Sequence, residues 1–240
     1  METNGETWCL KRLTEGHITI SCAFDVGANV GDWTLACRQH HPRSVIHAFE
    51  IAAPIFDRLQ RHVGNQPNTI LNSFGLSNQA EEIDLFLPEA EKEIGRATSY
   101  KDHLDPAFEI PGQEPTSFQK IRSKVIRGDD YVKTSKVQMI DFLKIDVEGM
   151  EESVLLGLSE TFAARRVRIV QFEYNTTNIV SKFLLRNAYQ FFNTHGYIVG
   201  KLYPNYIEFR DYHYRHEDFC GPNMIAVRND DRELLKLLGP

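Results

Sequence analysis

The chain lacks long apolar runs, and none approaches the length that a membrane-spanning helix requires. Its first residues hold neither a basic cluster nor a following apolar stretch, so no secretory signal is predicted there. Cys-x-x-Cys spacing is also missing, which argues against a zinc site of that kind and against a redox pair. The cysteines are Cys9, Cys22, Cys37 and Cys220. We expect reduced thiols and a cytoplasmic location.

A basic stripe is missing as well. Lysine and arginine are scattered, and the net charge is −6. A nucleic-acid-binding surface would need clustered positive charge, so neither nucleic acid nor a membrane surface is an expected partner. The sequence gives no indication of the oligomeric state.

What is present suits one domain, because 240 residues of which 42% are hydrophobic can bury a real core. Apolar runs alternate with amphipathic segments, which is typical of a doubly wound parallel sheet with helices on both faces. The expected strands are 18–25, 44–50, 69–76, 83–87, 139–146, 167–174, 197–203 and 224–228. The expected helices are 33–40, 54–63, 150–158, 179–195 and a last one capped by Asp230 or Asp231.

One segment has little periodicity. Residues 88–124 contain four prolines and many charges. A long irregular segment in a compact domain is more often a functional lid than a plain connection. We therefore predict a single domain over residues 1–240 with an irregular insertion or lid at 88–124.

The most informative stretch runs from Phe24 to Asp32 (FDVGANVGD). A strand that ends in Asp25 and breaks into small residues lets backbone N–H groups approach a ligand closely. The helix expected to begin near Asp32 would direct its positive end to the same place. Small residues stand at Gly27, Asn29 and Gly31, whereas a dinucleotide fingerprint requires Gly-x-Gly-x-x-Gly. This spacing is typical of enzymes that use S-adenosylmethionine (SAM).

Two further strand ends add candidate cofactor contacts. Glu50 follows the Gly27 turn by about 20 residues, where an acid commonly accepts hydrogen bonds from ribose hydroxyls. Glu50 could instead be a solvated acid that caps the next helix. Ser77 ends the third expected strand, near where an adenine could lie, although an ordinary turn explains it equally well.

A third group of strand ends is acidic. Asp146 ends a strand, and Glu148 and Gly149 form the turn into a helix. Lys144 shares a strand face with Asp146, and we expect it to pair with a carboxylate and fix the turn. Glu173 ends the following strand, where it either belongs to the site or caps the next helix.

These sequence motifs together resemble those of the FkbM-type methyltransferase family. The resemblance is carried by FDVGANVG at 24–31, HAFE at 47–50 and LKIDVEGME at 143–151. The acid-rich GDDYV at 128–132 and, loosely, GRATSY at 95–100 are similar too. The LKIDVEGME motif is the most specific of these, since the glycine turn is shared by SAM-dependent methyltransferases in general.

The resemblance implies a Rossmann-like class I fold with a seven-stranded, mostly parallel sheet. It also implies methyl transfer from SAM to a hydroxyl of a sugar, polyketide or other small natural product. By position, Asp25, Gly27, Asn29 and Gly31 would hold the methionine end of SAM, and Glu50 the ribose. Asp146 and Glu148 would border the sulfonium and the acceptor.

Methyl transfer to an alcohol requires a group that accepts its proton. We expect Asp146, Glu148 and Glu173 to supply it, or to bind a divalent cation that lowers the hydroxyl pKa. Asp146, Glu173 and Asn175 offer the oxygen ligands that Mg²⁺ prefers. His213, in an aromatic and histidine-rich loop, is the rival base.

Two other functions stay open. One is an NAD(P)-dependent oxidoreductase on a similar sheet, which the glycine spacing disfavours. The other is a non-catalytic SAM-binding module, against which the intact acids Asp146 and Glu173 argue. Nucleic-acid methylation is disfavoured by the negative net charge and by the lack of an Asn-Pro-Pro-Tyr-like motif.

Overall fold

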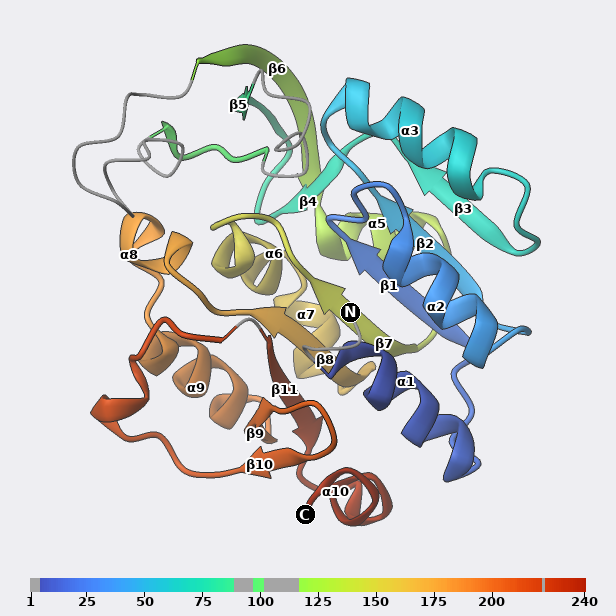
Figure 1. Ribbon diagram of the computed structural model, residues 1–240, viewed down its shortest axis with the longest axis vertical. Coiled ribbons are helices and arrows are strands. Elements are labelled where there is room, and N and C mark those ends of the chain that lie inside the picture. The colour runs from blue at the N-terminus through green and yellow to red at the C-terminus, as the bar shows by residue number, and fades with distance from the viewer. Residues whose placement is uncertain (1–4, 89–96, 102–116, 222) are drawn as a thin grey trace.

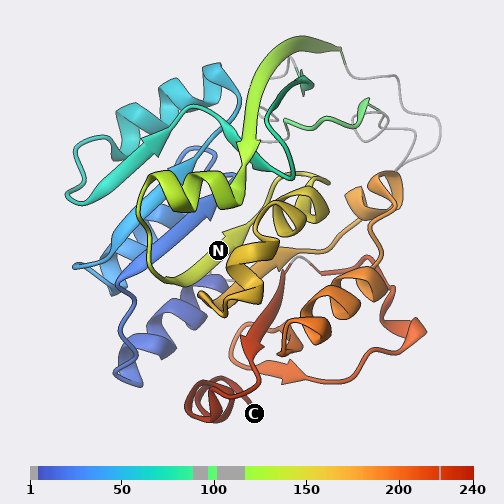
Figure 2. The same ribbon diagram turned by 180° about the vertical axis from the view of Figure 1, so that it is seen from behind.

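A twisted central sheet with helices on both faces forms the body of the protein in the computed structural model, which describes residues 5–88, 97–101, 117–221 and 223–240 (Figures 1 and 2). Its strands are β1 (Cys22–Val26), β2 (Val45–Phe49), β3 (Thr69–Asn72), β7 (Ile140–Ile145), β8 (Val167–Glu173), β9 (Tyr197–Leu202), β10 (Ile207–Phe209) and β11 (Asn223–Arg228). Their order is β10-β9-β11-β8-β7-β1-β2-β3. The strands from β3 to β8 are parallel, and the remaining three pair antiparallel at the other side.

The chain order reverses at β1, which lies between β2 and β7. In an open α/β sheet a ligand binds beyond the carboxyl ends of the strands at such a reversal. The turns after β1, β2 and β7 therefore border the expected site.

Two helical layers cover the sheet, and strand residues alternate between them. Ala23, Phe142 and Ile169 pack toward one layer, while Phe24, Leu143 and Val170 pack toward the other. The first layer holds α1 (Glu6–Glu15), α2 (Asp32–His40), α3 (Ala53–Val63) and α10 (Arg232–Leu238). The second holds α5 (Gly128–Thr134), α6 (Glu151–Gly157), α7 (Ser159–Ala163) and α9 (Leu185–Thr194).

A second, smaller sheet lies beyond the carboxyl ends of the main strands (Figure 1). It consists of β4 (Gly75–Ser77), β6 (Phe118–Arg127) and β5 (Glu81–Pro88), in that order. Thr98 extends it through a bridge to Phe86. Of the lid expected at 88–124, residues 118–124 belong to β6, and residues 89–96 and 102–116 lie outside the described residues.

The main sheet differs from the expected seven strands, because it has eight. The unpredicted strand is the three-residue β10, which pairs with β9 at the sheet edge. The expected strand 69–76 is also wrong, since β3 and β4 belong to different sheets. Asn72 ends β3, and its side-chain amide donates to the carbonyl of Ala48.

The expected helix 179–195 is two helices, α8 (Thr177–Ser181) and α9. Lys182 stands between them with φ 62°, and the Glu217 carboxylate accepts hydrogen bonds from the first two N–H groups of α9, Leu185 and Arg186. Glu217 follows the short helix η3 (Tyr214–His216), far along the sequence. At the C-terminus the expected cap is confirmed, because Asp231 accepts from Leu234 N.

No helix in the described part of the chain has both the length and the apolarity needed to cross a bilayer.

Candidate active site

The turn after β1 packs directly against the turn after β7. Gly27 has φ 81°, and a Cβ atom there would lie 1.7 Å from the carbonyl oxygen of Asp146. Only glycine tolerates both this conformation and this approach. Gly31 caps α2, and the space beside it is filled by Leu59 and Val63 of α3.

A buried charge network ties the two turns together. The Lys144 ammonium lies 3.4 Å from Asp25 Oδ1 and 3.2 Å from Asp146 Oδ2, and it donates to the Gly27 carbonyl at 3.1 Å. Asp25 also accepts from the Thr34 hydroxyl at 2.7 Å. Burial by itself would lower the Lys144 pKa, yet the attraction of Asp146 and Asp25 raises it. The expected carboxylate pairing of Lys144 is confirmed.

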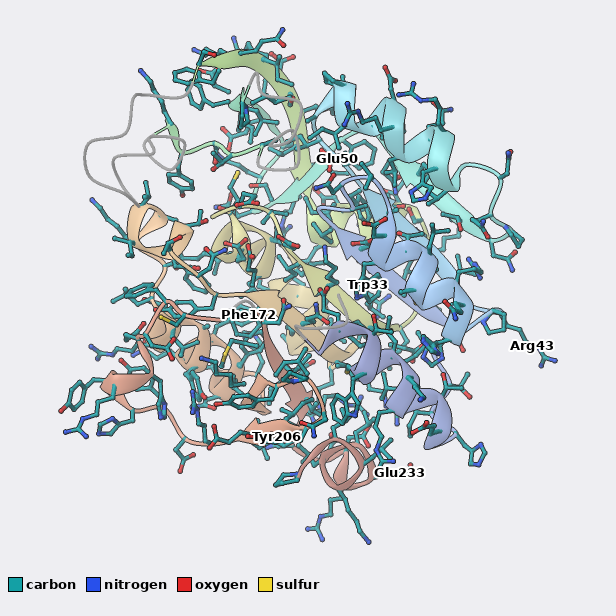
Figure 3. All side chains as sticks on the ribbon, viewed as in Figure 1. Trp33, Arg43, Glu50, Phe172, Tyr206 and Glu233 are labelled. Carbon is teal, nitrogen blue, oxygen red and sulfur yellow. The ribbon has the colours of Figure 1, made fainter. Side chains whose placement is uncertain are left out.

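Glu50 follows β2 and shapes the next part of the wall. Its two carboxylate oxygens accept from Asn29 N at 3.0 Å and from Ala52 N at 2.8 Å. Only 6% of the residue is exposed. Burial raises the pKa of Glu50 to about 7, although the two backbone hydrogen bonds oppose the shift. Figure 3 labels Glu50 beside the entry to α3 and Trp33 on the first turn of α2.

These turns enclose a cavity of about 240 Å³. The main sheet contributes the backbone of 26–30 together with Glu50, Lys144 and Asp146. The small sheet contributes apolar side chains, and Ala97 lies on the same wall. These residues are Leu76, Leu85 and Val125. The cavity therefore combines a glycine turn, an acid and an apolar surface.

Three acids converge where β7 and β8 end. Carboxylate oxygens of Asp146, Glu148 and Glu173 all lie within 4.8 Å of one another. Burial raises the pKa of Glu173 well above its usual value, with repulsion from Asp146 and Glu148 adding to the shift. Glu173 therefore holds its proton more tightly than an ordinary carboxyl group does. The cluster has the chemistry of a proton acceptor or of a divalent-cation site.

A fourth acid, Glu151, stabilises the backbone of the turn that follows β7. Glu151 is 1% exposed, and its Oε1 accepts from Val147 N at 3.1 Å and from Gly149 N at 3.3 Å. Burial raises the pKa of Glu151 to about 7. Glu151 belongs to the LKIDVEGME motif from which the turn was predicted. Its hydrogen bonds to the backbone of that turn were not predicted.

Segment 97–101 covers the acid turn from the side of the small sheet. The buried Thr98 hydroxyl donates to the Glu148 carbonyl at 2.7 Å and accepts from Tyr100 N at 3.1 Å. The Tyr100 ring lies so close to Gly149 that a Cβ there would stand 2.8 Å from it. Thr98 thus links the small sheet to the turn that carries Glu148.

Some of the expected site residues lie apart from the cavity wall. Asp25 is fully buried behind the glycine turn, and Ser77 is 1% exposed beside α6. His213 is exposed and caps η3, where its ring accepts from Arg215 N. Asn175 uses its side-chain oxygen to accept from Thr177 N at 2.7 Å. Glu6 of α1 lines the cavity and was not predicted, since no motif surrounds it.

Comparison with known proteins supports the family that the sequence motifs indicated. A family profile described as "Methyltransferase FkbM domain" matches residues 25–199. The hexuronic acid methyltransferase AglP of Haloferax volcanii is 26% identical over 171 residues, which cover 71% of this chain and 63% of AglP. The 31-O-demethyl-FK506 methyltransferase FkbM of Streptomyces tacrolimicus is 29% identical over 153 residues, covering 57% of this chain and 60% of that protein. The chain thus matches less than two thirds of the length of either relative.

Among solved structures, the plantazolicin methyltransferase BpumL in complex with SAH has a TM-score of 0.50 and 8% sequence identity. The match covers 94% of this chain and 82% of that one. At this identity the likeness concerns the fold, which is that of class I SAM-dependent methyltransferases.

Proposed function

Because the chain belongs to the FkbM methyltransferase family, we propose that it transfers a methyl group from SAM to a hydroxyl oxygen of a sugar, a polyketide or another small natural product. The observation that carries this proposal is the charge of the cavity wall. The described lining residues include five carboxylates and one ammonium; they are Glu6, Asp32, Glu50, Asp146, Glu148 and Lys144. Such a wall stabilises a sulfonium cation, whereas it would repel the pyrophosphate of a dinucleotide.

The residues present fit SAM. The Glu50 carboxylate lies on the wall and would accept from the ribose hydroxyls, and the backbone of 27–30 would hold the methionine end. Apolar residues of the small sheet and α3 would flank the adenine; they are Ile55, Leu85 and Val125. When bound, SAM supplies a methyl carbon made electrophilic by the attached sulfonium.

The acid cluster takes the acceptor's proton in this proposal. Asp146 is 36% exposed at its side chain and lines the cavity, so an acceptor hydroxyl can reach it. Lys144 fixes its orientation through the 3.2 Å ion pair, and the Glu173 carboxyl group lies beside it, within 4.8 Å. A fixed carboxylate orients the hydroxyl toward the methyl group as well as removing its proton. His213 is not assigned a part, because it is exposed on η3 and absent from the cavity wall.

The same acids could act by holding a divalent cation, since hard oxygen ligands within a few ångströms of one another suit Mg²⁺. Exhaustive EDTA treatment separates the two versions. We expect turnover to survive it, as a direct proton acceptor requires. Activity that disappears with EDTA and returns with added Mg²⁺ would assign the cluster to the metal instead.

The proposed function is tested in two steps. Calorimetry measures binding of SAH and of NAD⁺ to the folded protein, and we expect SAH to bind and NAD⁺ to fail. Incubation with methyl-labelled SAM and an acceptor panel follows, with mass spectrometry of the product. The panel includes hexuronic acids and 31-O-demethyl-FK506, because these compounds appear in the names of the two relatives. SAH binding without turnover of any acceptor would favour a non-catalytic SAM-binding module.

A further inference from the structure

Two of the sequence motifs that indicated the family meet in a buried polar cluster that the proposed chemistry does not use. His47 belongs to HAFE in β2, and Tyr131 belongs to GDDYV in α5. His47 Nδ1 lies 2.7 Å from the Tyr131 hydroxyl, and this hydroxyl donates to Asn72 Oδ1 at 3.2 Å. All three residues are buried. Polar groups this far from water require their hydrogen bonds, so each atom of the cluster has a defined role as donor or acceptor.

The direction of these hydrogen bonds is fixed from the Asn72 end. The amide nitrogen of Asn72 lies 3.1 Å from the Ala48 carbonyl oxygen and 3.3 Å from the Ile70 carbonyl oxygen, and carbonyl oxygens only accept. The side-chain oxygen of Asn72 therefore accepts from the Tyr131 hydroxyl. Because that hydroxyl has a single proton, its oxygen must accept from His47 Nδ1, which carries a proton of its own.

The surroundings of His47 and Tyr131 agree with this order. Burial lowers the pKa of His47 to about 4, so its ring is neutral near pH 7 and holds one proton. The Ser135 hydroxyl is also within hydrogen-bonding reach of the Tyr131 oxygen, which has a lone pair left to accept from it. The Tyr131 ring packs edge-to-face on Phe24 and Phe49, with centroid distances of 5.8 and 4.8 Å. Figure 2 shows α5, in yellow-green, over the strands β1 and β2 that carry these rings.

Asn72 connects the cluster to the cofactor site. Its backbone carbonyl accepts from Glu50 N at 3.0 Å, and its side chain bonds to Ala48, two residues before Glu50. Glu50 stands just past the end of β2, so the Asn72 carbonyl fixes the place where the main chain leaves the sheet. The hydrogen-bonded cluster thus continues to the acid that lines the cavity and is assigned to the ribose.

We propose that Tyr131 is a positioning residue for cofactor binding, acting on Glu50 through Asn72. The proton on His47 Nδ1 orients the Tyr131 hydroxyl toward Asn72. This inference rests on the proposed function, because it requires Glu50 to bind the ribose of SAM. It gives a role to two motif residues that do not belong to the described cavity wall.

A double-mutant cycle in calorimetry tests the inference without turnover. Tyr131→Phe keeps the ring but removes the hydroxyl, and we expect it to weaken SAH binding about fivefold, the size of one neutral hydrogen bond. In a Glu50→Ala background no carboxylate remains to be positioned, so the same substitution should change SAH affinity by less than about twofold. Tyr197→Phe is the matched control, because it removes the hydroxyl bond of another buried tyrosine, to Val167 O at the amino end of β8. It should leave SAH affinity unchanged.

The order of the protons is tested on the unmodified protein by nitrogen-15 NMR of the histidine rings. The signals of His47 are identified by their loss in His47→Asn. We expect this ring to be protonated on Nδ1 and not on Nε2. Protonation on Nε2 instead would overturn the inference, because the Tyr131 hydroxyl would then donate to His47 and could not donate to Asn72.

The outcomes of the cycle separate this inference from the proposed function. SAH affinity that Tyr131→Phe leaves unchanged would overturn the inference. An equal loss in the wild-type and Glu50→Ala backgrounds would do so too, because the tyrosine would then act by another route. Wild-type protein that is folded yet binds no SAH would refute the proposed function itself. If thermal unfolding shows Tyr131→Phe to be misfolded, Asn72→Ala replaces it in the same cycle, since it removes the side chain that links Tyr131 to β2.

Discussion

The two walls of the cavity are built in different ways. The main-sheet wall consists of turns that directly follow β1, β2 and β7, and short-range features define it: Gly27, an acid at each strand end and the Lys144 network. The small-sheet wall depends on β4, β5, β6 and Thr98, which meet the main sheet through long-range contacts such as Thr98 to Glu148. We infer that the first wall supplies the chemistry and holds the methionine and ribose parts of SAM, and that the second flanks the adenine and positions the acceptor.

The largest expected effect tests the chemistry of the main-sheet wall. Asp146→Asn should lower kcat about 1,000-fold, because general-base catalysis contributes on the order of 10²- to 10⁴-fold. Steady-state turnover with the identified acceptor measures it. His213→Ala, on the exposed η3 turn, is the comparison variant and should retain activity within about twofold. A loss in the histidine variant with full activity in Asp146→Asn would reverse the assignment.

An intermediate effect concerns Glu50 and pH. Because burial raises its pKa to about 7, Glu50 is neutral below that pH and a carboxylate above it. Ribose hydroxyls donate more strongly to a carboxylate, so SAH affinity should fall as pH decreases from 8 to 6. The total loss should approach about tenfold and then level off at lower pH, because the neutral carboxyl group still accepts, only more weakly.

Glu50→Gln is the control for that pH dependence. It should bind SAH about 10-fold more weakly at pH 8, as expected when a charged acceptor is replaced by a neutral one. Its affinity should also lose the component of the pH dependence that Glu50 causes. Glu151, whose pKa is also raised to about 7, remains in both proteins, so the difference between them isolates Glu50. Parallel pH profiles for the two proteins would contradict the ribose assignment.

The smallest expected effect concerns Thr98, on the small-sheet wall. Thr98→Val keeps the side-chain shape but removes the hydroxyl that donates to Glu148 O. One hydrogen bond of about 1 kcal/mol corresponds to roughly fivefold in kcat/KM for the acceptor. SAH affinity should stay unchanged in calorimetry. Thr194→Val removes a similar hydroxyl bond, to Gln190 O in α9, and should leave both quantities unchanged. Weaker SAH binding in Thr98→Val would remove the functional distinction between the walls.

The sequence allowed the main-sheet wall to be predicted because its determinants are close together along the chain. The Gly27 turn and the Lys144 pairing follow from residues two to four positions apart and from the order of parallel strands. The cap of α10 by Asp231 is local in the same sense.

The missed features depend on residues distant in sequence. Asn72 ends β3 by bonding to Ala48, and Glu217 starts α9 from the far side of β9. Glu6 reaches the cavity through contact with Gln171, which is 165 positions away. No periodicity or motif encodes such pairs, so they become visible only once the chain has folded.

The close approach of Gly27 to the Asp146 carbonyl has an evolutionary consequence. The two turns leave no free volume between them, so a substitution that shifts one must displace the other and disturb the grip on the cofactor. Substitutions that change the acceptor specificity are therefore expected away from the contact between these two turns. We expect such substitutions to be tolerated better around Thr98, away from the residues proposed to hold the methionine and ribose parts of the donor.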